Sequence, residues 1–520
     1  MPHQTANPAE RIRRRGSILL LVLVAVTVMA LCTMTYLEMM HNEHRAAHFA
    51  GRQQQARLLA ESGVAYLQTF LESSSEEIYQ DGGLWDNRDV MQAVIVVEDV
   101  LSTGQGRFTI VTPDLSQGYY SDLHYGLENE SAKLNLNTLL QGEGPKQSTA
   151  RDRLLAIPGM EDDVADAILD WIDSDSQARD FGAEEVYYES LDPPYEPTNG
   201  PLASLDELLQ VRGVTPELLY GVDANRNYLV DENERPRGLL MQLDNTNGQL
   251  DRGWSAYLTL HSLEKQVDSE GQPKIDVNSA DLKVLHKKLE TVLDQNAAKF
   301  IIAYRQYQRA SDDASGTVVD SASLQLDFKK EAQQTIGSLL DLVGARLSVQ
   351  VSEGAKPQLV ESPWKEGLST YRGELLELHD QLTVGSEPYL AGRVNINQAS
   401  RPVLLSVPGL SQSAVDQILL HRERQLRGAS DDQRHAVWIL GQGIVSQEEM
   451  KQLEPLITSA GDVYSGQVVG FFDSGSPTAR LEVIFDRSGS STRLVSWNDW
   501  TRLGTGFSAE QLGGEAEEDH

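Results

Sequence analysis

The chain has 520 residues and carries 77 acidic against 44 basic side chains, a net charge of −33. The length allows about three or four domains, and so acidic a surface repels nucleic acids and anionic membranes while it favours divalent cations and basic partners. A single cysteine, Cys32, excludes an internal disulfide framework and a cysteine-based metal site.

A basic cluster at positions 11–15 precedes an apolar run. Ser17 to Leu37 form 21 residues without a charge, and a helix needs about 20 apolar residues to span a bilayer. The run is longer than a signal-peptide core, and no small-residue cleavage site follows it. Basic residues stay on the cytoplasmic side of a membrane. We therefore expect a single-pass span with a cytoplasmic N-terminus and the bulk of the chain on the far side.

Gly16 lies between the last arginine and the first apolar residue, where it offers a peptidase an unhindered backbone. The arrangement resembles the leader of type IV pilins and pseudopilins, which implies cleavage between Gly16 and Ser17. Most such subunits carry Glu at the fifth mature position, where this chain has Leu21. That departure resembles the minor pseudopilin family called type II secretion system protein K. A charge inside a membrane span is costly and normally kept for a function, so its absence indicates a subunit with no partner above it.

Apolar residues recur at helical spacing through 38–80 with no proline before Ile78, which predicts that the membrane helix continues as an amphipathic extension. Asp81-Gly82-Gly83 would end this helix. A coiled coil or stalk behind a signal anchor is the alternative, although Gly51 and Gly63 interrupt a heptad pattern. Pilin-like strands are expected over 81–133.

Three segments of the remaining chain resemble one another, and such internal repeats indicate repeated structural units. The strong copies run from Lys133-Leu134-Asn135-Leu136-Asn137 to a Pro158-Gly159 turn, and from Arg393-Val394-Asn395-Ile396-Asn397 to a Pro408-Gly409 turn. A weaker copy starts at Lys274. We expect helical hairpin domains over 134–222, 273–345 and 393–462, with an acidic loop and strands at 223–272 and connecting strands at 346–392.

The two Pro-Gly turns resemble helix-hairpin-helix or SAM-like units. In DNA-binding examples the backbone amides of this turn approach a phosphate, so a membrane-anchored nucleic-acid binder of the competence type is the alternative function. Phosphate binding depends on Lys and Arg, whereas the second helix of the first hairpin is strongly acidic around Asp162 to Asp175. No nucleic-acid partner is expected.

An ordered series of motifs extends the resemblance to protein K from the leader to about Tyr220. It includes Asp170-Trp171-Ile172-Asp173, Gly182-Ala183-Glu184-Glu185-Val186-Tyr187-Tyr188 and Leu202-Ala203-Ser204-Leu205-Asp206. The resemblance implies a pilin-like subunit with an inserted helical domain that binds calcium and caps the tip of a periplasmic pseudopilus. The implied partners are other minor pseudopilins, the major pseudopilin, the prepilin peptidase and the inner membrane.

The segment 223–234 has the ligand spacing of a calcium loop. Oxygen-bearing side chains stand at positions 1, 3, 5, 9 and 12 of this loop, namely Asp223, Asn225, Asn227, Asp231 and Glu234. Tyr228 replaces the glycine usual at position 6, and Arg226 adds a positive charge. Calcium and an ion-free Asx-rich loop both remain open here.

A second candidate for calcium is the carboxylate group Asp173, Asp175, Glu184 and Glu185 in the region that resembles protein K. These acids repel one another unless they are solvated or bridged by a cation. The spacing does not assign the ligating oxygens.

Catalytic motifs are not found: the sequence lacks a G-x-S-x-G elbow, a phosphate-binding loop and H-E-x-x-H. We do not expect an enzyme. Alternating residues at 463–507 predict closing strands, and 508–520 an acidic tail. The expected fold is α+β, with a long N-terminal transmembrane helix, a pilin-like antiparallel sheet and inserted helical hairpin domains.

Overall fold

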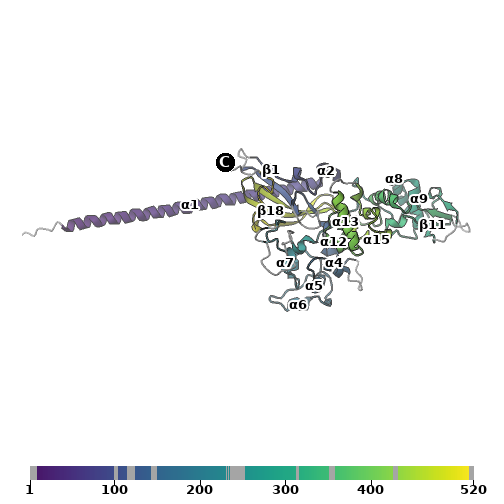
Figure 1. The fold of residues 1–520 in the computed structure, drawn as a ribbon, viewed down its shortest axis with the longest axis horizontal. Coiled ribbons are helices and arrows are strands. Elements are labelled where there is room, and N and C mark those ends of the chain that lie inside the picture. The colour runs from purple at the N-terminus through teal and green to yellow at the C-terminus, as the bar shows by residue number, and fades with distance from the viewer. Residues whose placement is uncertain are drawn as a thin grey trace, which may run out of the picture.

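The computed structural model describes residues 9–98, 104–113, 123–141, 149–229, 231, 234, 252–311, 316–350, 358–425 and 431–514. One long helix projects from a body in which a strand-rich part is joined to helical parts (Figure 1). The expected α+β class with a long N-terminal helix and an antiparallel sheet is confirmed.

Helix α1 spans Ala9–Glu72, so the membrane run and its extension form one continuous helix. It is the one helix within the described residues that is long and apolar enough to cross a membrane. Residues 18–51 are exposed, and the last third of the helix is packed against the body. The helix ends earlier than expected because Ser74 caps a separate helix α2 (Ser75–Gln80) through a capping box with Glu77.

The outer part of α1 packs on the sheet rather than forming a coiled coil. Ala56, Ala60 and Val64 are buried in one core cluster with Val468 and Leu481 of the sheet. Gly63, which interrupts the heptad pattern, faces the sheet so closely that a Cβ there would lie 2.5 Å from Val468. A single packed face therefore explains both the apolar spacing and the glycine.

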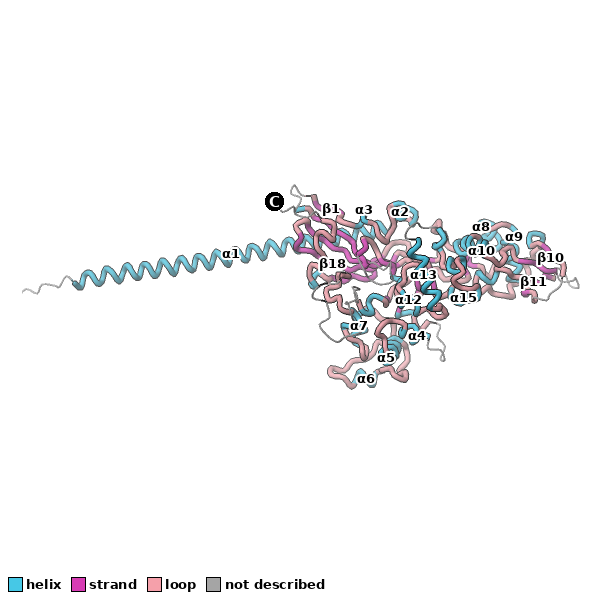
Figure 2. The backbone as a smooth tube through the Cα atoms, viewed as in Figure 1, coloured by secondary structure: helices cyan, strands magenta, loops and turns pink. Residues whose placement is uncertain are grey.

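Strands from both ends of the described chain build the main sheet (Figure 2). Its path is β1-β2-β17-β18-β19, with β3 paired to β2 and β4 paired to β17, and each pairing is antiparallel. The strands are β1 (Val94–Val97), β2 (Gly106–Pro113), β3 (Leu123–His124), β4 (Glu128–Asn129), β17 (Val463–Phe472), β18 (Gly475–Asp486) and β19 (Arg493–Asp499), and α3 (Arg88–Met91) precedes them. All three repeats are thus inserted between β4 and β17.

Each repeat opens and closes on a short parallel ladder. The ladders pair β5 (Leu134–Asn135) with β6 (Leu258–Thr259), β8 (Ile275–Asp276) with β13 (Leu382–Thr383), and β15 (Val394–Asn395) with β16 (Ile457–Thr458). In each opening strand the last side chain accepts a hydrogen bond from the backbone N–H two residues later: Asn135 from Asn137, Asp276 from Asn278, and Asn395 from Asn397. The repeats predicted from the sequence therefore share one local geometry, but they extend to 259, 383 and 458 rather than to 222, 345 and 462.

Helices fill each ladder-bounded unit. The first unit contains α4 (Thr149–Leu155), α5 (Asp162–Ile172), α6 (Glu185–Glu189) and α7 (Pro216–Tyr220). The second unit contains α8 (Leu282–Val292), α9 (Gln295–Gln306), α10 (Leu368–Arg372) and α11 (Glu374–Gln381). The third unit contains α12 (Arg401–Leu405), α13 (Gln412–Gln425), α14 (Trp438–Gly441) and α15 (Gln447–Leu453). The second also has a four-stranded sheet of β9 (Gln308–Arg309), β10 (Val318–Val319), β11 (Arg346–Val349) and β12 (Gln358–Glu361), while β7 (Leu263–Lys265) pairs with β14 (Tyr389–Ala391) outside the units.

The strong copies make their helix-turn-helix connections at the predicted Pro-Gly turns. Gly159 and Gly409 have φ values of 72° and 87°, a left-handed backbone that favours glycine. The middle copy joins α8 to α9 without such a turn, because Asp294 caps α9 by accepting a hydrogen bond from the N–H of Ala297.

Two further expectations differ from the structure. The segment 346–392, expected as connecting strands, does contain strands, but it also supplies helices α10 and α11 to the second repeat. The tail predicted from 508 begins as packed structure: Leu512 is fully buried and its carbonyl accepts a hydrogen bond from Thr109 Oγ1 at 2.7 Å. Residues 515–520 lie outside the described part of the chain.

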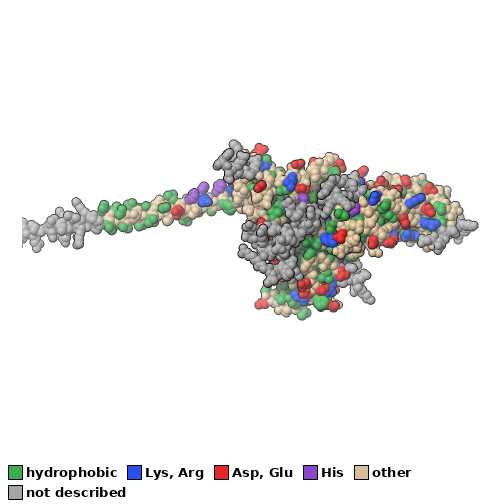
Figure 3. Space-filling view, in the orientation of Figure 1, with side chains coloured by type: hydrophobic (Ala, Val, Ile, Leu, Met, Phe, Trp, Pro, Cys, Tyr) green, Lys and Arg blue, Asp and Glu red, His purple; other side chains and the backbone are tan. Residues whose placement is uncertain are grey.

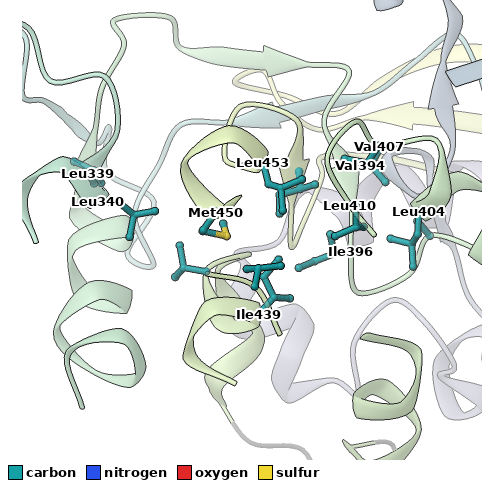
Figure 4. Packing of buried hydrophobic residues seen from close by; sticks show 14 of the residues in the cluster. Leu339, Leu340, Val394, Ile396, Leu404, Val407, Leu410, Ile439, Met450 and Leu453 are labelled. Carbon is teal, nitrogen blue, oxygen red and sulfur yellow. The ribbon is translucent and has the colours of Figure 1, made fainter. Parts of the chain in front are cut away.

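One apolar core cluster runs through all three repeats, from Ala132 to Ile457. Figure 4 shows the join between the second and third repeats, where Leu339 and Leu340 lie near Met450 and Leu453. The repeats are therefore not independently packed units, because burial of their shared core holds them against one another.

Candidate metal centre

The acidic segment after α5 forms a compact carboxylate cluster. Helix α5 is buried along most of its length, so Asp170 near its end has no exposed surface. One oxygen from each of Asp170, Asp173 and Glu184 lies within 4.8 Å of the others. Asp170 and Asp173 are three residues apart and share one face of the α5 terminus, and the chain then turns back to bring Glu184 to them.

Arg179 partly neutralises this cluster. Its Nη1 donates to Asp170 Oδ1 at 2.6 Å and to Asp173 Oδ2 at 2.5 Å, and its backbone N–H also points at the Asp170 carboxylate. Burial raises the pKa of the Asp170 carboxyl even though Arg179 favours its charged form. Three carboxylates against one guanidinium leave a local excess of negative charge.

Glu184 carries the unmatched part of that charge. Its side chain is 6% exposed, and neither carboxylate oxygen has a hydrogen-bond partner among the described residues. Burial, together with the nearby charges of Asp170, Asp173 and Asp175, raises the pKa of Glu184 to about 7. A buried carboxylate without a partner is costly, so the position calls for a proton or a cation.

Gly182 allows the loop to close over the cluster. A Cβ at this position would lie 1.7 Å from Asp170 Oδ2, a distance that no side chain tolerates. The backbone of Gly182 therefore lies directly against the carboxylate, and only glycine fits.

The structure gathers part of the predicted carboxylate set and adds one member. Asp173 and Glu184 lie in the cluster, whereas Asp175 accepts a hydrogen bond from the N–H of Gln177 and Glu185 begins α6 exposed to solvent. The sequence interpretation missed Asp170 as a member of the cluster. Its spacing of three residues from Asp173 on a helix was the available signal.

The second predicted site, the loop 223–234, is held by internal hydrogen bonds, but its three acids do not form a carboxylate cluster in the described chain as Asp170, Asp173 and Glu184 do. Asp231 Oδ2 accepts hydrogen bonds from Asn225 Nδ2 at 2.5 Å and from Asn227 Nδ2 at 3.0 Å. Glu234 accepts from the backbone N–H groups of Asn225 and Asp231. Asp223 is 3% exposed and accepts from the N–H groups of Asn227 and Tyr228.

In this conformation the side-chain oxygens of the loop accept hydrogen bonds from N–H groups of the same loop. Two guanidiniums, Arg252 and Arg480, counteract the effect of burial, which raises the pKa of the Asp223 carboxyl. Arg226 and Tyr228 take positive φ values of 56° and 66°. Calcium at these five residues stays a prediction.

The tips of the Pro-Gly turns are exposed at Pro158, Gly159 and Gly409, while groups around them make contacts with the rest of the chain. The Pro158 carbonyl accepts a hydrogen bond from Trp254 Nε1 at 3.0 Å, and Arg151 beside the first turn pairs with Asp162 at 2.8 Å. At the third-repeat turn, a Cβ on Gly409 would contact Leu453 at 3.8 Å. The first turn is thus tied to the body through its Pro158 carbonyl, while the tips of both turns stay accessible to solvent.

Comparisons with known proteins point to one family, and the family model covers the region that holds the carboxylate cluster. Residues 132–222 match the family model described as type II secretion system (T2SS), protein K. Type II secretion system protein K of Aeromonas hydrophila is 48% identical over 56 residues. The resemblance to type II secretion system protein K is thereby confirmed. The aligned part spans 11% of this chain and 17% of that relative.

A solved structure gives a much weaker likeness. In the GspK-GspI-GspJ complex of the type 2 secretion system of enterotoxigenic Escherichia coli, one chain is 12% identical, with a TM-score of 0.38. The superposition covers 86% of this chain and 99% of that chain. A score this low does not establish a shared fold.

Proposed function

We propose that the chain is a minor pseudopilin of a type II secretion system, that it caps the tip of the pseudopilus, and that it takes part in export of folded proteins across the outer membrane. The observation that carries the proposal is the protein K match at 132–222, inserted in a sheet that packs on a membrane-type helix. In this proposal α1 anchors the chain in the bacterial inner membrane, with its N-terminus in the cytoplasm and the bulk of the chain in the periplasm. No enzymatic step is needed.

The arrangement of the body supports a capping role. The second and third repeats lie beyond the sheet, away from the exposed half of α1, and the first repeat lies beside the sheet (Figure 1). In a helical assembly held together by N-terminal helices, a subunit above this one would have to pass the volume of the repeats. Leu21 removes the charge that would engage such a neighbour.

The exposed half of α1 offers an apolar surface to the N-terminal helices of other pseudopilins. Beyond the membrane run it carries Met39, Met40 and Phe49, which are 66%, 48% and 55% exposed. Figure 3 shows the helix standing free of the body with apolar side chains along it. Such a surface fits the N-terminal helices of other minor pseudopilins and of the major pseudopilin beneath it.

Processing of the leader tests the assignment. Gly16 and Ser17 lie within α1 of the unprocessed chain. We expect co-expression with a prepilin peptidase to yield a mature chain that starts at Ser17, detected by N-terminal sequencing, while Gly16→Leu stays uncut. In a strain that keeps the other secretion components but lacks this chain and therefore export, the wild-type chain should restore cargo export and Gly16→Leu should not.

An inactive peptidase is the control for that experiment. A wild-type chain that retains Met1 beside an active peptidase contradicts the pseudopilin assignment.

Calcium is the cofactor proposed for the cluster of Asp170, Asp173 and Glu184. The donor set is made of hard carboxylate oxygens, which calcium prefers, and Glu184 presents two buried oxygens without partners in the described chain. Bound calcium would neutralise the charge that Arg179 leaves over. Calcium at the 223–234 loop is a weaker proposal. The oxygens of this loop already accept hydrogen bonds from groups within it, and these bonds would have to break before calcium could bind.

Thermal melting tests the cluster. A ligand that binds only the folded state raises the melting temperature by an amount that grows with its concentration. We expect calcium to raise the melting temperature of the wild-type chain over that in calcium-free buffer, and Gly182→Ala to lose most of this shift because its Cβ displaces the Asp170 carboxylate.

Gly200→Ala is the matched control for Gly182→Ala. A Cβ at Gly200 would make an ordinary contact of 3.7 Å with the Thr198 carbonyl, so this variant should keep the calcium response. An equal response in both variants would rule out the cluster as the calcium site, without touching the pseudopilin assignment.

A further inference from the structure

A cavity of about 320 Å³ lies where the second and third repeats meet. Its wall takes residues from the end of β7, from the segments before β8 and after α11, and from α15 and the chain after β16. A neighbouring cavity of about 420 Å³ shares Gln266 and Lys274 with it. The site belongs to neither carboxylate cluster described above.

The wall of this cavity is cationic in a strongly acidic protein. Five lysines and arginines line it against three acids, whereas the whole chain has 44 basic and 77 acidic side chains. The cations are Lys265, Lys274, Arg393, Arg434 and Lys451. Concentrated charge in a recess with low-dielectric walls attracts counter-ions.

The three acids of the wall are already engaged. Glu264 pairs with Arg393 at 3.2 Å, and Glu454 pairs with His379 at 2.8 Å. Asp462 accepts a hydrogen bond from the Lys265 N–H at 2.7 Å. Among the cations, Lys451 is paired as well, with Asp341 at 3.2 Å and Glu448 at 3.1 Å.

Lys274 and His435 line the wall outside these ion pairs. The Lys274 ammonium donates to the His379 carbonyl at 2.6 Å and forms no ion pair within the described residues. Burial lowers the pKa of Lys274. Burial, with the positive charges of Lys274, His379 and Arg434, lowers the pKa of His435 to about 3, although Asp380 lies 3.5 Å from its Nε2.

A donor on the cavity wall is also without a partner. Gln266 is 9% exposed, and its Oε1 accepts a hydrogen bond from Thr383 Oγ1 at 3.2 Å. Its Nε2 makes no hydrogen bond in the part of the chain that the structure describes. A buried donor is normally satisfied by protein, water or ligand.

We propose that this cavity binds a small oxyanion, a phosphate or a carboxylate, held by the Lys274 ammonium and the His435 ring and bonded to Gln266 Nε2. Such an anion supplies an acceptor for Gln266 Nε2 and a counter-ion for the Lys274 ammonium. Because Lys274 belongs to the second repeat and His435 to the third, the bound anion joins these two units.

Calorimetric titration of the full-length chain in non-ionic detergent tests the proposal, with inorganic phosphate and succinate as probes in calcium-free buffer. Sodium chloride at matched ionic strength is the reference. We expect saturable binding of at least one probe and about tenfold or greater weakening in Lys274→Met, since a hydrogen bond to a charged group is among the stronger ones. Tighter binding of phosphate identifies a phosphate site, and tighter binding of succinate a carboxylate site.

Two variants separate the site from general salt effects. Gln266→Leu removes the unpaired donor at similar volume and should also weaken binding. Lys287→Met removes an exposed lysine on α8 and should bind as the wild type does. Absence of saturable binding in the wild type overturns the proposal. Equal affinity of the wild type and Gln266→Leu does so too, even where Lys274→Met does not fold.

Discussion

At the scale of single residues, Glu184 is the most informative side chain of the protein K region. It is buried beside two carboxylates and Arg179, and its own oxygens have no partner in the described chain. Its neighbours could be named from the sequence, but its isolation could not, because that depends on how the loop after α5 folds back.

Glu184 predicts a pH dependence of stability in calcium-free buffer. An ordinary Glu has a pKa of about 4.3 in the unfolded chain, whereas that of folded Glu184 is about 7. Between these values the folded state holds a proton that the unfolded state has released, so raising the pH lowers the free energy of unfolding. We expect the wild type to lose on the order of 1–3 kcal/mol relative to Glu184→Gln between pH 4.5 and pH 8, measured by urea denaturation.

Glu185→Gln is the control for this measurement. Glu185 is exposed at the start of α6, so its variant should follow the wild type across the whole range. A wild type and a Glu184→Gln variant with parallel pH profiles would mean that Glu184 is solvated like its neighbour.

At the scale of elements, each repeat is held by an asparagine that reaches across the unit. Asn137 Oδ1 accepts a hydrogen bond from the Leu202 N–H at 2.8 Å, and its Nδ2 donates to the Leu202 carbonyl at 3.0 Å. Asn278 makes the same pair of bonds with Ile336. Asn397 donates to the carbonyls of Gln433 and Ser459.

Asn137→Ala should therefore loosen the first repeat alone. The substitution leaves a buried N–H and carbonyl at Leu202 without partners, at a cost of about 1–3 kcal/mol. We expect faster amide hydrogen exchange around Leu202 and unchanged exchange around β16. Asn397→Ala should give the reverse pattern, and faster exchange in both repeats from either variant would contradict local closure.

The repeats show which parts of the fold the sequence pattern could predict. The Asn motifs and Pro-Gly turns are local, so the strong copies could be recognised in the chain. The middle copy looked weaker because α8 and α9 join without a Pro-Gly turn. The later half of the middle copy nevertheless has a matching signal in the sequence. Ser338 caps a short 3-10 helix at Leu339–Leu342, as Ser204 caps one at Leu205–Gln210 in the first repeat.

At the scale of the whole molecule, acidity separates the pseudopilin proposal from the nucleic-acid alternative. The net charge is −33, and the first hairpin turn is packed through the Pro158 carbonyl. Counterion release on binding a phosphate backbone requires a cationic surface. We expect no salt-dependent retention of double-stranded DNA in a filter-binding assay with the full chain.

A basic DNA-binding protein run in parallel is the positive control. Retention that falls steeply with salt would instead favour the competence-type alternative, in which the hairpin turns contact phosphate.

The sequence by itself determined those features that depend on neighbours along the chain. The membrane run of α1, the Asn-motif repeats, the Pro-Gly turns and the alternating strands of 463–507 all follow from local composition and spacing. Gly16 likewise needs only its place beside Ser17 to suggest a leader.

Only the tertiary structure decided which distant residues meet. The parallel ladders join β5 to β6 and β8 to β13 across more than a hundred residues of sequence, and the cationic cavity forms only where two repeats pack together. Such contacts depend on burial of a shared core, which is roughly proportional to the apolar area removed from water and carries no signature in local spacing.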